Sequence, residues 1–421
     1  MTNTRVPAFA LALSLAAALL AACAGQPDRA LTISGSFLGR EGQVLRVQLD
    51  RFRQANPGLD VQLRATPDAA DQRHQLYVQW LNARATDPDV LQLDVVWTAE
   101  FSAAGWIAPL DRFTPVVDDF FPNVVAANRW NGTLYALPWF VDVGMLYWRT
   151  DLMPAAPADL QALREAALDA RRQHGVPYGF VWQGARYEGL VTVFLEHLGA
   201  FGGAILDEAG QVVVDRPEAV AALTYMRDAI HADGFVPSSV LTWQEEQTRF
   251  AFQNGEAAFM RNWPYAYSLL ADAAQSSVAG RFAVAAMPAA AGGAPAAALG
   301  GAVLAVNAHS ELPDEAYRLI EFLLQPEQMI ERAAIAGQFP PRRSLYETGA
   351  LEKALTIPAA DAMRVIQHAV ARPATPVYSQ LSEILQVALH RALTQQQEPR
   401  EALHGAAAGM RTLLARVRLS E

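Results

Sequence analysis

A cluster of aromatic and polar side chains follows a short apolar run in the second half of the chain. The segment AFMRNWPYAY, residues 258–267, places Trp263 and Tyr265 on either side of a helix-breaking proline. Carboxylates stand in other apolar runs, at Asp94 in VLQLDVVW and at Asp142 in LYALPWFVDVGMLY. A pyranose needs this mixture, because its C–H face packs on an aromatic ring and its hydroxyls bond to carboxylates, amides and guanidinium groups. These residues predict a sugar-binding site.

The sequence lacks the motifs that carry phosphate, dinucleotide or metal chemistry. It contains no P-loop, no GxGxxG after a strand, no HExxH and no CxxC. The eight histidines are scattered, and His390 and His404 fall in amphipathic stretches near the C-terminus. We therefore expect neither a metal nor another cofactor. The net charge of −10 argues against a nucleic-acid partner.

Strand and helix signals alternate in the first part of the chain. Residues 31–35, 59–65 and 90–97 are predicted strands, and residues 42–56 and 71–85 have the helical spacing of apolar side chains. This alternation predicts an α/β fold with a parallel sheet. Ligands of such sheets bind at the carboxyl ends of the strands. Asp94 lies towards that end of the third strand.

The same pattern resumes further along the chain. Residues 134–147 are extended, apolar and interrupted by Pro138. Helices are predicted over residues 215–233, capped by Asp215, and over 245–253 and 313–324, and strands over 257–260 and 299–306. The Ala- and Gly-rich residues 289–301 read as a loop into the last of these strands. The final stretch of about 60 residues is mostly helical by its period.

The N-terminus has the layout of a lipoprotein signal peptide, which we assign to residues 1–23. One cation, Arg5, precedes an apolar run that is shorter than the roughly 20 residues a membrane-spanning helix needs. The run ends in Leu20-Ala21-Ala22-Cys23, which resembles a bacterial lipobox, and Cys23 is the only cysteine in the chain. The alternative is a plain signal peptide with an incidental cysteine. We expect a protein outside the cytoplasm, lipid-anchored to a membrane through Cys23, with residues 24–30 as a linker.

The length and composition of the remaining chain indicate two folded domains. About 400 residues exceed what one hydrophobic core usually holds. Hydrophobic residues make up 52% of the chain and charged residues 18%, a balance typical of globular domains rather than disorder.

Seven segments along the chain resemble those of a known family. They are REGQVLRVQLDRFRQANPG, LQLDVVWTAEF, LYALPWFVDVGMLYWRTDL, GFVWQGARYEGLV, FQNGEAAFMRNWPYAY, LGGAVLAV and ARPATPVYSQLSEILQ. In this order they resemble the solute-binding lipoproteins of ABC sugar importers, in the branch that binds trehalose and maltose. The resemblance implies a type II periplasmic-binding-protein fold, with residues 31–140 and 305–355 in one lobe and 143–298 and 358–420 in the other. It also implies a monomer without enzymatic activity, which closes around a sugar and delivers it to the permease of an ABC transporter.

The resemblance also assigns roles to individual residues. It implies that Glu41 is a cleft-facing carboxylate on the first helix, and that Asp94 and Asp142 are the main hydroxyl-binding carboxylates. Trp263 and Tyr265 match an aromatic pair. The remaining matches are Gly301 at a backbone contact and Arg372 as a guanidinium near the sugar. Two positions depart from the family pattern: Phe140 stands where a tyrosine is expected, and Ala302 where the motif has a tryptophan.

Other interpretations of these residues stay open. Glu41 and Asp94 could be ordinary acids at a helix start and a strand end, and Arg372 could brace a loop. We expect Trp97, Trp139 and Trp182 to be core residues, and assign Tyr147 and Tyr267 to packing. The main alternative function is binding of a polyol, glycerophosphodiester, polyamine or oligopeptide. A chemoreceptor partner is compatible with sugar binding, and a glycosidase using Asp94 and Asp142 as an acid–base pair is a competing class.

Overall fold

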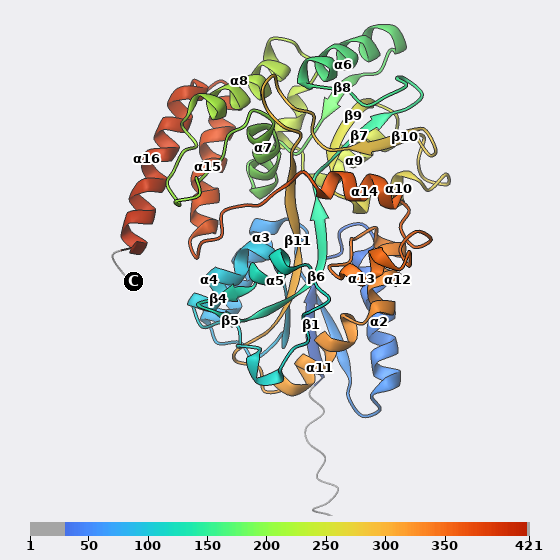
Figure 1. Cartoon of the computed structure of the whole chain (residues 1–421), viewed down its shortest axis with the longest axis vertical. Helices are drawn as coiled ribbons and strands as arrows, with labels where there is room; N and C mark the ends of the chain where they lie inside the picture. Colours follow the sequence, from blue (N-terminus) through green and yellow to red (C-terminus); the bar gives the residue numbers. More distant parts are fainter. Residues whose placement is uncertain (1–29, 419–421) are drawn as a thin grey trace, which may run out of the picture.

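The computed structural model describes residues 30–418, which form two large β-sheets flanked by helices and a small two-stranded sheet (Figure 1). The predicted signal peptide, the predicted lipobox cysteine Cys23 and most of the predicted linker lie outside the described part. One sheet lies in the lower half of Figure 1 and the other in the upper half. The long strands β6 (Ala136–Val143) and β11 (Ala297–Val306) run between the two halves. The chain is therefore a two-lobed α/β protein, as the sequence predicts.

The lower sheet has the order β12-β11-β3-β1-β2, with β6 paired to β11. Strands β1 (Leu31–Gly35), β2 (Val61–Ala65) and β3 (Val90–Asp94) are parallel, as expected, whereas β11 runs antiparallel to β3. The short β12 (Ala369–Val370) pairs with the start of β11. The elements around this sheet are α2 (Glu41–Ala55), α3 (Ala70–Asn82), η1 (Val95–Trp97), α4 (Thr98–Ala103), η2 (Asp111–Phe113), α5 (Pro122–Ala126), β4 (Arg129–Trp130), β5 (Thr133–Leu134), α11 (Pro313–Leu323), α12 (Pro326–Ala336) and α13 (Arg343–Glu347).

The upper sheet has the order β10-β7-β9-β8. Its strands are β7 (Met145–Arg149), β8 (Tyr178–Val181), β9 (Ala257–Asn262) and β10 (Phe282–Ala285). The surrounding elements are α6 (Leu160–His174), α7 (Glu188–Ala200), α8 (Pro217–His231), η3 (Ser238–Thr242), α9 (Glu245–Gln253), α10 (Tyr265–Leu270) and α14 (Ala359–Ile366). The C-terminal helices α15 (Tyr378–Leu393) and α16 (Pro399–Arg418) pack against each other, and both also contact α8.

Strand β6 continues through Pro138, where the sequence predicts an interruption. Pro138 pairs with Val303 and Phe140 with Ala302, so Trp139 is an extra residue and the register shifts. A bulge at the outer strand of a ladder tolerates a proline, which has no N–H to donate. The same bulge changes which side chains of β6 face the junction between the sheets.

Several predicted boundaries differ from the structure, and specific contacts explain three of them. Strand β3 ends at Asp94, because the Asp94 carboxylate accepts a hydrogen bond from the backbone N–H of Val96 and starts a 3₁₀ turn. Asp215 does not cap α8, whose N-cap residue is Arg216; the Asp215 carboxylate instead accepts from Arg411 of α16. The Ala- and Gly-rich segment is already a strand from its Ala297 onward. A local hydrogen bond ends β3, whereas tertiary partners decide the other two ends.

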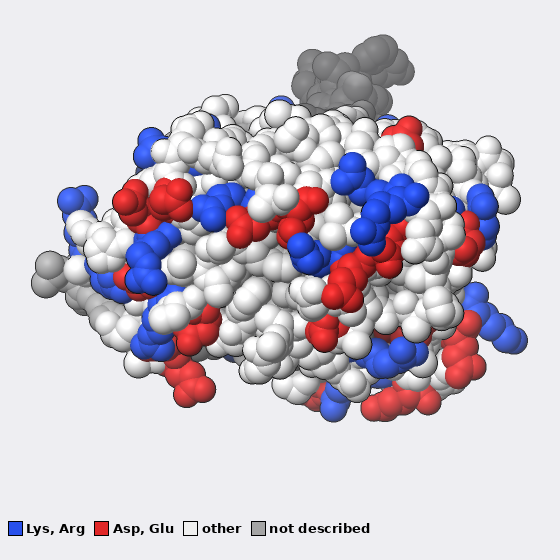
Figure 2. Space-filling view, turned by 90° about the horizontal axis from the view of Figure 1, so that it is seen from above, with Lys and Arg blue, Asp and Glu red and all other residues white. Residues whose placement is uncertain are grey.

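Charges of both signs are mixed on the face seen in Figure 2. Arginines lie next to acidic side chains over that face, with uncharged areas between them. A nucleic-acid-binding surface gathers cations in one patch or stripe instead. No helix between residues 30 and 418 is long and apolar enough to cross a membrane.

Candidate functional site

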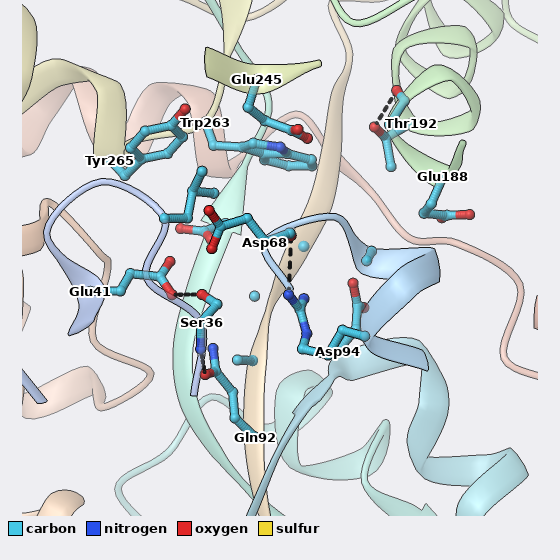
Figure 3. A pocket seen from close by; sticks show the side chains of 18 of the residues that line it. Ser36, Glu41, Asp68, Gln92, Asp94, Glu188, Thr192, Glu245, Trp263 and Tyr265 are labelled. Carbon is cyan, nitrogen blue, oxygen red and sulfur yellow. Dashed lines mark hydrogen bonds between the residues drawn. The ribbon is translucent and has the colours of Figure 1, made fainter. Parts of the chain in front are cut away.

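A cavity lies at the junction of the two sheets, and all seven residues that the sequence singled out line it (Figure 3). Trp263, Tyr265 and Glu245 enter from one side, and Glu41 and Asp94 from the opposite side. Its volume is about 100 Å³, less than the few hundred Å³ around a typical drug-sized ligand. The lining residues are Ser36, Leu38, Glu41, Asp68, Ala70, Arg73, Gln92, Asp94, Phe140, Asp142, Tyr187, Glu188, Gly189, Thr192, Glu245, Trp263, Tyr265, Gly300, Gly301, Ala302 and Arg372.

The carboxylate of Asp142 lines the cavity with one oxygen unsatisfied. It comes from β6, opposite Gly300 of β11. Its Oδ1 atom is buried and has no hydrogen-bond partner among the described residues. Burial raises the pKa of Asp142 well above its usual range, and the like charges of Glu41 and Asp94 raise it further. A buried acceptor without a partner is costly, so this oxygen is ready to bond to a ligand.

Glu41, at the start of α2, is held in place from both sides. Ser36 Oγ donates to one carboxylate oxygen, and Gln338 Nε2 donates to the other at 2.7 Å. Burial raises the pKa of Glu41. Behind it, Arg332 donates to Gln338 at 2.6 Å, and burial lowers the pKa of Arg332 to about 10. Glu41 is thus a fixed acceptor at the cavity wall rather than a solvated acid of a first helical turn.

Arg372 joins carboxylates from opposite sides of the cavity. Its Nη2 atom lies 2.7 Å from Asp94 Oδ1 at the end of β3, and its Nη1 atom lies 3.0 Å from Glu188 Oε1 at the start of α7. Glu188 also accepts from the hydroxyls of Tyr378 and Ser382 in α15. Burial alone would lower the pKa of Arg372, but the charge of Asp94 and the other acidic partners raise it. Arg372 therefore lines the cavity and braces it at once.

Pro264 separates the two aromatic residues as the sequence predicts. Strand β9 ends at Asn262 and α10 begins at Tyr265. The ring of Trp263 is partly exposed in the cavity, next to Glu245 (Figure 3). Tyr265 also lines the cavity but is 3% exposed, and its hydroxyl donates to Glu246 at 2.7 Å. Trp263 is thus available for stacking, whereas the hydroxyl proton of Tyr265 already has an acceptor.

Two glycines of β11 allow the close approach of β6 and Trp263. Gly301 has φ +122°, and a Cβ there would lie 2.3 Å from the carbonyl oxygen of Phe140. A Cβ on Gly300 would lie 3.2 Å from the Trp263 ring. Side chains at either position would push the strands or the ring out of place. Phe140 and Ala302, which depart from the family pattern, both line the cavity.

Several lining residues were not predicted as binding residues. Tyr187 and Glu188 stand in GFVWQGARYEGLV. This segment is part of the family resemblance, but the sequence assigns none of its residues to ligand binding. Gln92 precedes Asp94 by two positions and so shares its face of β3, a period-2 signal that could have identified it. The others are Ser36, Leu38, Asp68, Ala70, Arg73, Gly189, Thr192, Glu245 and Gly300. Most of them come from loops and from the first turns of helices, which carry little periodic signal, whereas Gly300 lies in β11.

Four of the five residues expected to serve packing are buried, and Tyr267 is partly buried. Trp139 and Trp182 are each 1% exposed and Trp97 is 5% exposed, and none of them lines this cavity. Tyr147 is fully buried and its hydroxyl donates to the carbonyl oxygen of Trp263 at 2.7 Å. Tyr267 packs edge-on against Phe282. No group of three or more His, Cys, Asp or Glu side chains within residues 30–418 could hold a metal ion.

Known proteins resemble the chain over most of its length. The sequence profile of the bacterial extracellular solute-binding proteins matches residues 39–330. A probable ABC transporter-binding protein of Deinococcus radiodurans is 38% identical over 361 residues, which are 82% of this chain and 84% of that protein. The maltose-bound structure of T. maritima MalE3 is 41% identical, with a TM-score of 0.87 over 91% of this chain and 99% of that one.

A more distant structure supports the fold alone. The tagatose-bound solute-binding protein of Thermotoga lettingae TMO is 24% identical, with a TM-score of 0.83 over 92% of this chain and 100% of that one.

The more similar relatives are named as binding proteins. The profile match and the identity to the Deinococcus protein show that this chain belongs to the bacterial extracellular solute-binding proteins.

Proposed function

We propose that the protein binds a maltose- or trehalose-like disaccharide in this cavity and delivers it to the permease of an ABC transporter. The observation that carries the proposal is the buried, unpartnered Oδ1 atom of Asp142 near the partly exposed ring of Trp263. A carboxylate oxygen accepts from a sugar hydroxyl, and an indole ring packs on the C–H face of a pyranose. The maltose bound by the 41% identical MalE3 supports a disaccharide.

The charge balance of the cavity disfavours an anionic ligand. Six lining residues are carboxylic acids, and two are arginines. Arg372 is engaged by Asp94 and Glu188, and Arg73 donates to the backbone carbonyls of Pro67 and Asp68. A phosphodiester would face more acidic than basic groups, whereas neutral hydroxyls can donate to the carboxylates. We therefore favour a neutral sugar over the glycerophosphodiester alternative.

We propose that binding closes two lobes, formed by residues 31–140 with 305–355 and by residues 143–298 with 358–420. Several polar contacts link these parts. Arg372 binds Asp94, Ser379 Oγ donates to Glu100 at 2.7 Å, and Arg40 lies 3.2 Å from Asp272. The small cavity means that a disaccharide enters when the lobes separate. A ligand shifts such an equilibrium by its differential affinity for the two states.

We also propose that Cys23 carries a lipid anchor outside the cytoplasm. The family is described as extracellular, and Cys23 follows a lipobox-like sequence in a stretch outside the described residues. Mass spectrometry of protein purified from membranes tests this directly. The expected N-terminal peptide begins at an acylated Cys23. An unmodified N-terminus at another residue would contradict the anchor and leave sugar binding untouched.

Calorimetric titration of the purified protein tests the ligand. We expect saturable binding of maltose or trehalose at micromolar concentration and no binding of glycerophosphocholine, which carries a phosphate. Binding of mannitol in place of both disaccharides would assign the cavity to a polyol. Absence of binding by all of these sugars and polyols would overturn the proposal, and steady cleavage of a glycoside would replace it with a glycosidase.

A further inference from the structure

An arginine and a glutamate form an ion pair beneath the cavity that does not line it. Arg261 of β9 is 0% exposed and Glu196 of α7 is 1% exposed. The Arg261 Nε atom lies 3.0 Å from each Glu196 oxygen, and Nη2 lies 2.5 Å from Oε1. Nη1 donates to Gln183 at 3.1 Å. The pair is thus fully desolvated and geometrically specific.

The guanidinium of Arg261 also supports the cavity tryptophan. Its central carbon lies 4.0 Å from the centroid of the Trp263 ring. A guanidinium stacks on an indole through its planar charge, and lysine cannot reproduce both this contact and the forked bonds to a carboxylate. Arg261 therefore fixes the ring from one face, while the ring still borders the cavity.

Glu196 extends the pair to the junction between the sheets. Its Oε1 atom accepts from the backbone N–H of Ala298, at the start of β11, at 3.2 Å. Gly144 is the one residue between β6 and β7, and its N–H donates to the carbonyl oxygen of Ala298 at 3.0 Å. A Cβ on Gly144 would lie 1.7 Å from Glu196 Oε1. The carboxylate therefore lies directly against the chain where it passes from one sheet to the other.

A buried ion pair is an inefficient way to gain stability, because desolvation of both charges opposes their attraction. We propose that Arg261 and Glu196 are positioning residues for the cavity: they hold the Trp263 ring in its stacking orientation and tie that orientation to the Gly144–Ala298 junction. This role rests on the proposed sugar binding. It adds two residues that act on the ligand through Trp263 without touching it.

The test uses two variants of the pair and one matched control. Arg261→Lys keeps the charge and loses the stacked fork, and Glu196→Gln keeps the shape and loses the charge. Arg149→Lys is the control. Arg149 lies in the neighbouring strand β7, is also buried, and donates two hydrogen bonds to the carboxylate of Asp151. The protein is labelled with 5-fluorotryptophan, and the Trp263 resonance among the nine tryptophans is assigned with Trp263→Phe.

The fluorine spectrum without ligand and the maltose affinity are measured for each folded variant. We expect Arg261→Lys and Glu196→Gln to shift or broaden the Trp263 resonance and to raise the Kd for maltose at least tenfold. Arg149→Lys should leave both within twofold of the parent protein. In the Trp263→Phe background the effect of Arg261→Lys on Kd should shrink, which general destabilisation would not produce.

Two failures are distinguishable. If the parent protein binds no maltose, the disaccharide proposal fails, while the ligand-free fluorine spectrum still tests the positioning. An unchanged Trp263 resonance in both folded pair variants would overturn the positioning role whatever the sugar result. Equal effects of Arg149→Lys on the resonance and on Kd would overturn it as well. If Arg261→Lys fails to fold, Glu196→Gln carries the same comparison.

Discussion

Replacing Asp142 by asparagine should stabilise the folded protein and weaken its binding of sugar. The folded structure holds this carboxylate buried, with one oxygen unpartnered and with Glu41 and Asp94 close enough to repel it. Asparagine keeps the size of the side chain and removes the charge. Active and binding sites commonly trade stability for function in this way.

The pH dependence follows from the raised pKa of Asp142. In the unfolded chain an aspartate titrates near about 3.9. In the folded protein burial raises the pKa well above this value, so the folded state holds the proton more tightly. The protonated Asp142 therefore makes its full contribution to folding stability at pH values below the unfolded pKa. This contribution is lost as the pH rises through the folded pKa. The advantage of Asp142→Asn should be largest in neutral to alkaline solution and should disappear towards pH values near 4.

The magnitudes are measurable. Removing an unfavourable site charge commonly recovers about 0.5–2 kcal/mol, which raises the unfolding temperature of a protein of this size by a few degrees. Loss of a charged acceptor for a ligand hydroxyl costs about 1.5–3 kcal/mol, and we therefore expect an increase in Kd of about 10- to 150-fold. Scanning calorimetry at several pH values gives the first quantity, and titration with maltose gives the second.

Asp151→Asn is the matched control with the opposite sign. Hydrogen bonds from Arg149 lower the pKa of Asp151 in the folded protein, so its charge contributes stability above the unfolded pKa. This variant should destabilise the protein at neutral pH and leave sugar affinity unchanged. If Asp142→Asn also lowers the unfolding temperature at pH 8, our account of an unsatisfied carboxylate is wrong. Unchanged maltose affinity would remove Asp142 from the binding site.

Three further changes test other parts of the site. Trp263→Ala should weaken maltose binding by about 1–3 kcal/mol of lost stacking, measured by titration, whereas Trp182→Phe in the core should lower the unfolding temperature and spare affinity. Gly301→Ala should cost about 1–3 kcal/mol of stability in denaturant unfolding, because Gly301 has a positive φ and a close contact to the next strand. Gly405→Ala is the control and should be neutral or stabilising, because Gly405 has open space around it in α16. Equal effects of the two substitutions would refute the argument. Ser379→Ala removes a contact to α4 across the cleft. It should weaken the binding free energy of maltose by that of one hydrogen bond, about 0.5–1.5 kcal/mol, and give a more open shape in solution scattering. An unchanged Kd and shape would contradict the role of Ser379 in closure.

Local pattern was enough to predict much of the fold. The periodicity of residues 31–97 predicted the first three parallel strands and the helices between them, and all of them form. Pro264 and the apolar run before it predicted a strand end and a helix start, and both lie within two residues of the proline. These features depend on backbone sterics and on the burial of one face of an element. Such forces act over a few residues and are therefore visible in the sequence.

The site itself depends on contacts between distant parts of the chain. The sequence identified Asp94, Asp142, Trp263 and Arg372, but it could not show that Arg372 binds Asp94 and Glu188 together. It also offered no reason to prefer Asp142 as the unsatisfied carboxylate over Glu41, because that difference lies in which oxygens find partners. Hydrogen-bond satisfaction and desolvation are properties of the packed interior.

The amino-acid sequence by itself thus determined the classes of element, the absence of metal and nucleotide motifs, and the side chains suited to a sugar. The tertiary structure alone decided which of those side chains are free. Tyr265 was predicted beside Trp263 as an equal partner, yet its hydroxyl is held by Glu246 while the indole remains open to the cavity. Arg261, two residues before Trp263 in the segment AFMRNWPYAY, forms an ion pair with Glu196 and stacks on one face of the indole ring. Sequence specifies the donors and acceptors, and the packing of two sheets decides how many are left for a ligand.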